Sequence, residues 1–232
     1  MKITWLILLA VAPSIAIGLF VYLKDKYEKE PVLLMVKCFF LGVFSIIPPI
    51  LIELTFQYCG IYISRDIFIT LIYAFVAVGF SEELSKFLML RYGVYKKQAF
   101  NEPMDGIVYA VFISLGFATA ENIMYVSTGG FTVAILRMFT AVPAHGAFAI
   151  LMGFFVGKAK FSFHPKTYML LGLIVATLVH GFYDFFLFQL NIISLRLVSM
   201  GVLLLAIFFF DTCNPFSCAK FAFSKFNGLV EL

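Results

Sequence analysis

The sequence predicts an all-α protein, a polytopic membrane bundle of about seven transmembrane helices. The first observation is the composition, because 62% of the 232 residues are hydrophobic and only 13% are charged. A soluble domain is typically about 45–50% apolar and about 25% charged. The second observation is that apolar runs recur along the whole chain, each near the ~20 residues that a helix needs to cross a bilayer. This length leaves no room for a separate soluble domain.

The predicted spans follow one another with short polar connections. In order, they cover residues 3–23, 32–56, 67–90, 105–126, 131–156, 167–188 and 195–210. The first span has a sequence like a signal-peptide cleavage site at Ala10-Val11-Ala12. However, Pro13 follows directly and the apolar run continues, so we expect an uncleaved span.

Two spans contain features that disturb a regular helix or bring helices together. Pro48-Pro49 is expected to kink the second span, because proline removes backbone hydrogen bonds. Glu53, one turn further on, is interpreted as a carboxylate at the membrane interface. In the fifth span, Gly153 and Gly157 form a pattern of small residues that favours close helix packing.

The basic residues are distributed unequally between the two sides of the predicted bundle. Eleven belong to the first, third and fifth connections and the tail: Lys24, Lys26, Lys29, Arg91, Lys96, Lys97, Lys158, Lys160, Lys166, Lys220 and Lys225. Three lie on the other side: Lys2, Arg65 and Arg196. The richer side is expected to face the cytoplasm. We therefore predict an integral membrane domain over residues 1–211 and a cytoplasmic tail over 212–232. No basic stripe with stacking aromatics is present, so nucleic-acid binding is not expected.

The third span ends in charges that are unusual inside a membrane. Glu82 and Glu83 follow an uncharged run, and Lys86 comes one turn later, before more apolar residues. A charge in hydrocarbon costs about 2.5–3.5 kcal/mol on insertion scales, so such residues are functional candidates. Glu82 and Lys86 share a helix face and can pair, whereas Glu83 lies about 100° around the helix.

Three more spans carry ionisable residues of the same kind. Glu121 lies deep in the fourth span, where Arg137 is an available partner, and His145 in the fifth follows a proline. His180 and Asp184 are four residues apart in the sixth span and share a face, which suits either an oriented imidazole or a plain ion pair. Counting 1.5 Å per residue from the span ends places Glu82 and Glu121 about half a bilayer apart in depth.

Together these residues suit hydrolysis by an activated water. A buried carboxylate can take a proton from water, and an imidazole can share it or return it. His145, His180 and a carboxylate would also satisfy zinc, although no H-E-x-x-H motif is present. We predict that no metal ion or other cofactor is needed. Chains of carboxylates and histidines also occur in proton- or ion-coupled transporters, which leaves that reading open.

The ordered motifs of the chain resemble the PrsW family of bacterial intramembrane proteases. Those that carry the resemblance are 22–25 with Glu30-Pro31, Glu82-Glu83-x-x-Lys86, 105–109, 116–122, His145, 152–159 and 180–185. The family is in turn similar, at a distance, to type II CAAX prenyl proteases and bacteriocin-immunity membrane proteins. The resemblance implies an endopeptidase of the bacterial cell membrane. It would make the first, site-1 cut in a membrane-anchored anti-sigma factor during regulated intramembrane proteolysis.

The resemblance also implies roles for the polar residues. In the distant relatives a Glu-Glu motif and a histidine activate water, while a second histidine and an asparagine hold the oxyanion. This chain has Lys86 where they have arginine, Glu121 where they have histidine and Asp184 where they have asparagine. We therefore expect Asp184 to orient His180, and His145 to supply the second imidazole. The candidate catalytic residues are Glu82, Glu83, Glu121, His145, His180 and Asp184. A non-catalytic immunity or interaction protein of the same fold is a further alternative.

Overall fold

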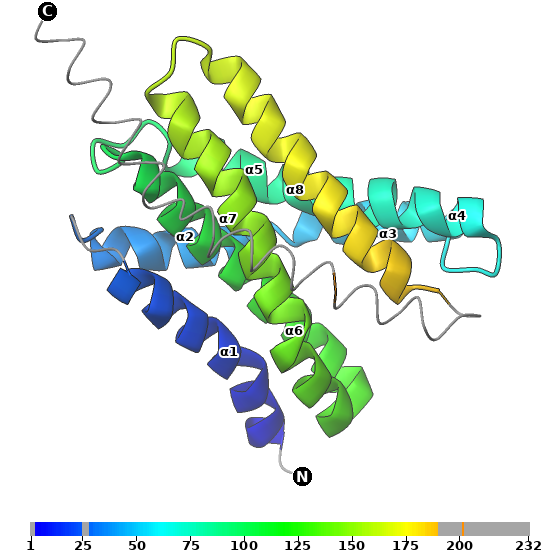
Figure 1. The fold of residues 1–232 in the computed structure, drawn as a ribbon. Coiled ribbons are helices and arrows are strands. Elements are labelled where there is room, and N and C mark those ends of the chain that lie inside the picture. Colours follow the sequence, from blue (N-terminus) through cyan, green and yellow to red (C-terminus); the bar gives the residue numbers. More distant parts are fainter. Residues whose placement is uncertain (1–2, 25–27, 190–200, 202–232) are drawn as a thin grey trace, which may run out of the picture.

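The computed structural model describes residues 3–24, 28–189 and 201, and these residues form helices without a strand (Figure 1). The elements are α1 (Ile3–Lys24), α2 (Val32–Phe44), α3 (Ile47–Tyr58), α4 (Ile67–Ile72), η1 (Tyr73–Phe80), α5 (Ser81–Gly93), α6 (Pro103–Phe139), α7 (Ala141–Lys160) and α8 (Pro165–Leu187). The all-helical membrane fold is thus confirmed.

Five segments of the described residues are long and apolar enough to cross a membrane. One of them, residues 103–160, contains both the fourth and the fifth predicted spans. Apart from residue 201, the seventh predicted span and the tail lie outside the described residues. The predicted count of seven is therefore not confirmed.

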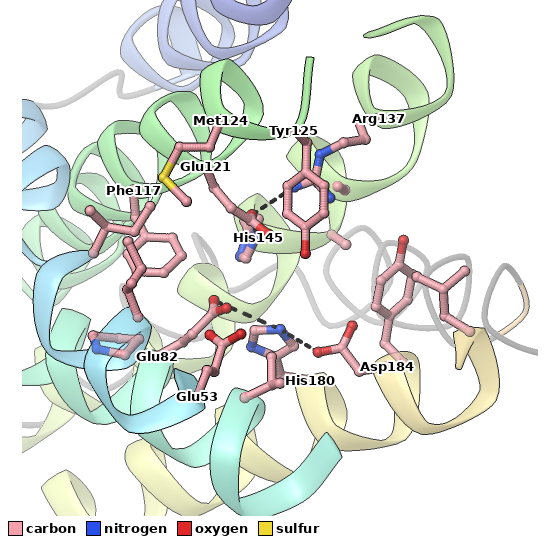
Figure 2. Close-up of a pocket in the computed structure, with 18 of the residues that line it drawn as sticks. Glu53, Glu82, Phe117, Glu121, Met124, Tyr125, Arg137, His145, His180 and Asp184 are labelled. Carbon is pink, nitrogen blue, oxygen red and sulfur yellow. Dashed lines mark hydrogen bonds and ion pairs between the residues drawn. The ribbon is translucent and has the colours of Figure 1, made fainter. Parts of the chain in front are cut away.

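The second predicted span is interrupted where its prolines begin. After α2 ends at Phe44, the Ser45 hydroxyl donates to the carbonyl of Gly42 over 2.7 Å. Then α3 starts at Ile47 with its prolines in the first turn, where a missing N–H costs no helical hydrogen bond. The break separates α3 from α2, and Glu53 on α3 points toward Glu82 and His180 (Figure 2).

The chain reverses direction at a kink inside the segment labelled α6. Gly130 takes a positive φ of 68°, where helical geometry is lost, and α7 begins at Ala141. The part of α6 before Gly130 packs antiparallel to α7. A Cβ at Gly153 would overlap the backbone of Gly106, and one at Gly157 would overlap Pro103. The close packing predicted for these two glycines is confirmed.

Helix α6 forms the centre of the core. Residues 104–119 of this helix are almost all buried, among them Ile107, Tyr109 and Phe117. Helix α2 crosses it so closely that a Cβ on Gly116 would collide with the carbonyl of Phe39. In Figure 1, α3 and the α4–η1–α5 segment lie across the direction shared by α6, α7 and α8. Residues far apart in sequence therefore meet where these two groups cross.

Candidate active site

A cavity of about 530 Å³ lies where α3, η1, α5, α6, α7 and α8 meet. Figure 2 shows the polar side chains on its wall pointing toward one another. Five of the six residues predicted as catalytic line this cavity: Glu82, Glu121, His145, His180 and Asp184. The sixth, Glu83, is fully buried behind the wall.

A π-helical segment sets the direction in which the two adjacent glutamates, Glu82 and Glu83, point. The eight residues of η1 lead directly into Ser81, Glu82 and Glu83 at the start of α5. A Cβ on Gly79 would lie only 3.1 Å from the backbone nitrogen of Gly181, so η1 packs tightly on α8. Short π-helical segments are rare and occur often at functional sites, because the wider turn redirects the residues that follow.

The ammonium group of Lys86 contacts both glutamates. Its Nζ lies 3.3 Å from Oε2 of Glu82 and 2.7 Å from Oε1 of Glu83. The predicted Glu82–Lys86 pair is present, and the shorter contact is to Glu83. Lys86 also lies over the ring of Phe117, 4.2 Å from its centroid, so a cation–π contact further stabilises the buried charge.

His145 links Lys86 to Glu121. Its Nδ1 lies 3.1 Å from Nζ of Lys86, and its Nε2 lies 2.8 Å from Oε2 of Glu121. An ammonium group can only donate, so Nδ1 accepts and Nε2 carries the proton that is donated to Glu121. Glu121 is also 2.7 Å from Nη2 of Arg137, and the ion pair anticipated from the sequence is formed. Arg137 is in turn held by Asn122, whose Oδ1 accepts from its Nε over 2.6 Å.

His180 lies between carboxylates on both sides of its ring. Its Nδ1 is 2.9 Å from Oε1 of Glu83 and its Nε2 is 3.1 Å from Oδ2 of Asp184. The Asp184 contact lacks hydrogen-bond geometry. The hydrogen bond that orients the imidazole therefore comes from Glu83, whereas Asp184 was expected to provide it. Phe148 stacks on the ring at a centroid distance of 4.6 Å.

Two expectations from the sequence are corrected by this geometry. Glu82 and Glu121 were placed at different depths, yet both meet at Lys86 and His145, because the α4–η1–α5 segment runs across α6. Glu53 was interpreted as interfacial, yet it lines the cavity and faces Glu82 and His180 (Figure 2). The signal for Glu53 was its position inside an apolar run, which marks an ionisable residue as a functional candidate.

The residue types on the cavity wall fit a divalent metal ion. Ligand atoms of Glu82, His145 and His180 all lie within 4.8 Å of one another. Two imidazoles and a carboxylate are a common catalytic zinc set, and each imidazole here has a further carboxylate contact of the kind that orients such ligands. These three residues would hold the ion, which would act as a Lewis acid on a peptide carbonyl. Lys86 contacts two of the three, so its positive charge opposes a second cation.

A cavity lined by carboxylates and imidazoles inside a bundle of apolar helices has the groups that a membrane-embedded hydrolase needs to activate water. Residues 30–211 match the model of the PrsW family intramembrane metalloprotease. The chain belongs to this family.

Curated relatives agree with this assignment. The chain is 38% identical over 183 residues to Protease PrsW of Geobacillus kaustophilus, covering 78% of this chain and 79% of the relative. Protease PrsW of Bacillus subtilis is also 38% identical over 183 residues, with 78% and 82% coverage. That of Clostridioides difficile is 37% identical over 191 residues, with 78% and 79% coverage. No solved structure matches the chain. The protein is therefore a multi-pass membrane peptidase. The two alternatives, an ion-coupled transporter and a non-catalytic interaction protein, do not account for these relatives.

Proposed function

We propose that this protein cleaves a membrane-anchored regulator, such as an anti-sigma factor, with a water molecule activated by Glu82. The observation that carries the proposal is the unequal placement of the two adjacent glutamates. Glu82 lies on the cavity wall, where a substrate carbonyl and a water can reach it. Glu83 is enclosed by Lys86 and His180 and has no access to the cavity.

The reaction begins with a proton transfer from water to the carboxylate of Glu82. The water oxygen bonds to the peptide carbonyl carbon and forms a tetrahedral intermediate. The C–N bond then breaks, and the proton passes to the leaving amine nitrogen, so that one carboxyl and one amine terminus result. Lys86 and His145 hold Glu82 and its surroundings in place through the contacts described above.

His180 assists the proton transfer. Its Nε2 lies 4.0 Å from Oε2 of Glu82, while its Nδ1 is fixed by Glu83. An imidazole held by a carboxylate in this way is kept in one tautomer, and the imidazolium that forms during the reaction is stabilised. Asp184 at Nε2 adds a second negative charge beside the ring.

The side of the membrane at which the cut is made follows from the loops near the cavity. Ile63 in the connection after α3 lines it, as do Ser127 and Thr128 in α6, just before the kink at Gly130. The connection after α3 and the kink at Gly130 are at the opposite end of the spans from the loops that carry most basic residues, so we propose that the cavity opens on the outer side. A cut there is the first cut in a regulator that signals from outside the cell.

Co-expression tests the proposal. The protein is produced together with tagged single-span anti-sigma factors in a host that lacks PrsW proteases, and immunoblots are used to detect a shortened membrane product. We expect one such factor to be shortened by the wild-type protein and not by Glu82→Gln at matched membrane levels. A product of the same size and amount with Glu82→Gln contradicts the proposed mechanism. Absence of any product from a full panel of factors contradicts the proposed substrate class.

A further inference from the structure

Glu53 is an acidic residue of the cavity wall to which the reaction above gives no role. Its carboxylate faces the interior beside Glu82 and His180 (Figure 2). Among the described residues no Lys, Arg or His forms an ion pair with it, in contrast to Glu82, Glu83, Glu121 and Asp184. A carboxylate at membrane depth without a cationic partner is costly, so a ligand that supplies the partner gains binding energy.

Two polar atoms on the part of α8 that lines the cavity are buried without a hydrogen-bond partner. They are the Tyr183 hydroxyl and Oδ2 of Asp184, and both residues line the same cavity. The Asp184 oxygen has the His180 ion pair at 3.1 Å but no hydrogen bond. Tyr183 is 3% exposed and Asp184 is 6% exposed, so water does not satisfy these atoms freely. Buried polar groups in native proteins normally have hydrogen-bond partners, and a ligand that supplies the partner is one explanation for such an exception.

Aromatic rings surround this end of the cavity. Tyr73 and Phe188 line it with their ring centroids 6.2 Å apart, and Phe188 follows Asp184 by one helical turn. The Tyr73 hydroxyl interacts with the Glu53 carboxylate and also accepts a hydrogen bond from Gln57 over 2.9 Å. Aromatic faces bind the aliphatic stem of a long side chain and attract a cation at its end.

From these contacts we propose that Glu53, Asp184, Tyr183, Tyr73 and Phe188 form a substrate subsite for a basic side chain, arginine or lysine, next to the scissile bond. Glu53 and Asp184 supply the negative charge, and the Tyr183 hydroxyl supplies a hydrogen-bond acceptor. The rings of Tyr73 and Phe188 contact the stem. This inference rests on the proposed peptidase function and adds a sequence preference to it. The metal-ligand set of Glu82, His145 and His180 does not include Glu53, so the two features are distinct.

The test profiles cleavage by the full-length protein in lipid nanodiscs. The probe is a pool of single-span reporter peptides that share one hydrophobic segment and carry ten randomised residues on its outer side. Products are sequenced by mass spectrometry to find the residues enriched at each position from the cut. Wild type is expected to enrich Arg or Lys at one fixed position. For individual reporters, Glu53→Gln is expected to lower the ratio of kcat/KM with Arg to that with Gln at this position at least tenfold. Glu53→Lys is expected to favour Asp or Glu there.

Glu28→Gln is the matched control, because Glu28 is an exposed glutamate that contacts Asn101 far from the cavity. It should keep the wild-type preference. No basic enrichment in wild type, or a loss in Glu53→Gln that is equal for all reporters, overturns the subsite while the peptidase function stands. No cleavage of any reporter by wild type overturns the peptidase function itself, and the subsite with it.

Discussion

Nδ1 of His180 lies 2.9 Å from Oε1 of Glu83, which joins α8 to α5 at the buried side of the cavity. The same carboxylate oxygen receives the ammonium of Lys86 over 2.7 Å. Glu83 therefore holds both Lys86 and His180 in place. Of the two glutamates, only Glu82 faces the cavity. Two neighbouring residues of one type thus have different roles.

The first prediction separates these roles. Glu82→Gln keeps the side-chain shape but removes the proton acceptor, so we expect cleavage to fall by about 10²–10⁴-fold, while the thermal unfolding temperature stays near wild type. Glu83→Gln weakens the contacts to Lys86 and His180, and we expect a loss of both activity and about 1–3 kcal/mol of stability. Substrate cleavage and thermal unfolding in nanodiscs measure the two effects. Near wild-type cleavage by both variants would refute the mechanism.

The second prediction concerns the imidazoles and Asp184. His145→Ala breaks the link between Lys86 and Glu121, and His180→Ala removes the proton carrier, so both variants should be severely impaired. Asp184→Asn should be milder toward a reporter without basic residues, because the orienting hydrogen bond to His180 comes from Glu83. Cleavage rates at matched protein levels provide the comparison. If Asp184→Asn is as damaging as His180→Ala, the charge of Asp184 takes part directly.

A third prediction addresses metal binding. We expect cleavage to persist after exhaustive chelation, because Lys86 already places a positive charge between Glu82 and His145. Replacing this lysine by methionine keeps the stem and removes the charge, so Lys86→Met should bind zinc at least tenfold more tightly than wild type. Calorimetric titration of zinc measures the affinity directly.

Lys97→Met, at an exposed position, is the control for the titration and should match wild type. Tight zinc binding by wild type, together with cleavage that chelation abolishes and zinc alone restores, would show that the ion takes part in catalysis.

The fourth prediction tests the orientation in the membrane. The first, third and fifth connections between the predicted spans are expected in the cytoplasm, because they carry most of the basic residues. Cysteines introduced at Lys97 and Lys166, both exposed, should resist an impermeant thiol reagent added to intact cells. The native Cys59 is exposed in the connection after α3 and should react from outside, which provides an internal control. Labelling of the introduced cysteines with protection of Cys59 would reverse the assignment.

The sequence predicted those parts of the fold that depend on residues close together in the chain. The pairing of Glu82 with Lys86 follows from their separation of four on one helix, and the packing role of Gly153 and Gly157 follows from their spacing. The approximate extent of the apolar spans was likewise predicted from local composition.

Long-range relationships were not accessible in the same way. The Glu83–His180 hydrogen bond and the position of Glu53 depend on how α3 and the α4–η1–α5 segment cross the other helices. Depths counted along single straight helices failed for Glu82 and Glu121, since crossing helices meet where parallel ones would not. A periodic pattern indicates which face of a helix is apolar, but it does not give the angle at which two helices cross.

The π-helical stretch of η1 has a consequence for how Glu82 keeps its direction. Residues of an α-helix follow one another at about 100° around the axis, and the wider turns of Tyr73–Phe80 change that step. If those eight residues rewound as an α-helix while α4 stayed in place, Glu82 would turn away from Glu53 and the cavity. The direction of the proposed base therefore depends on the winding of its own backbone as well as on the contacts that join Glu83 to His180 and Lys86 to His145.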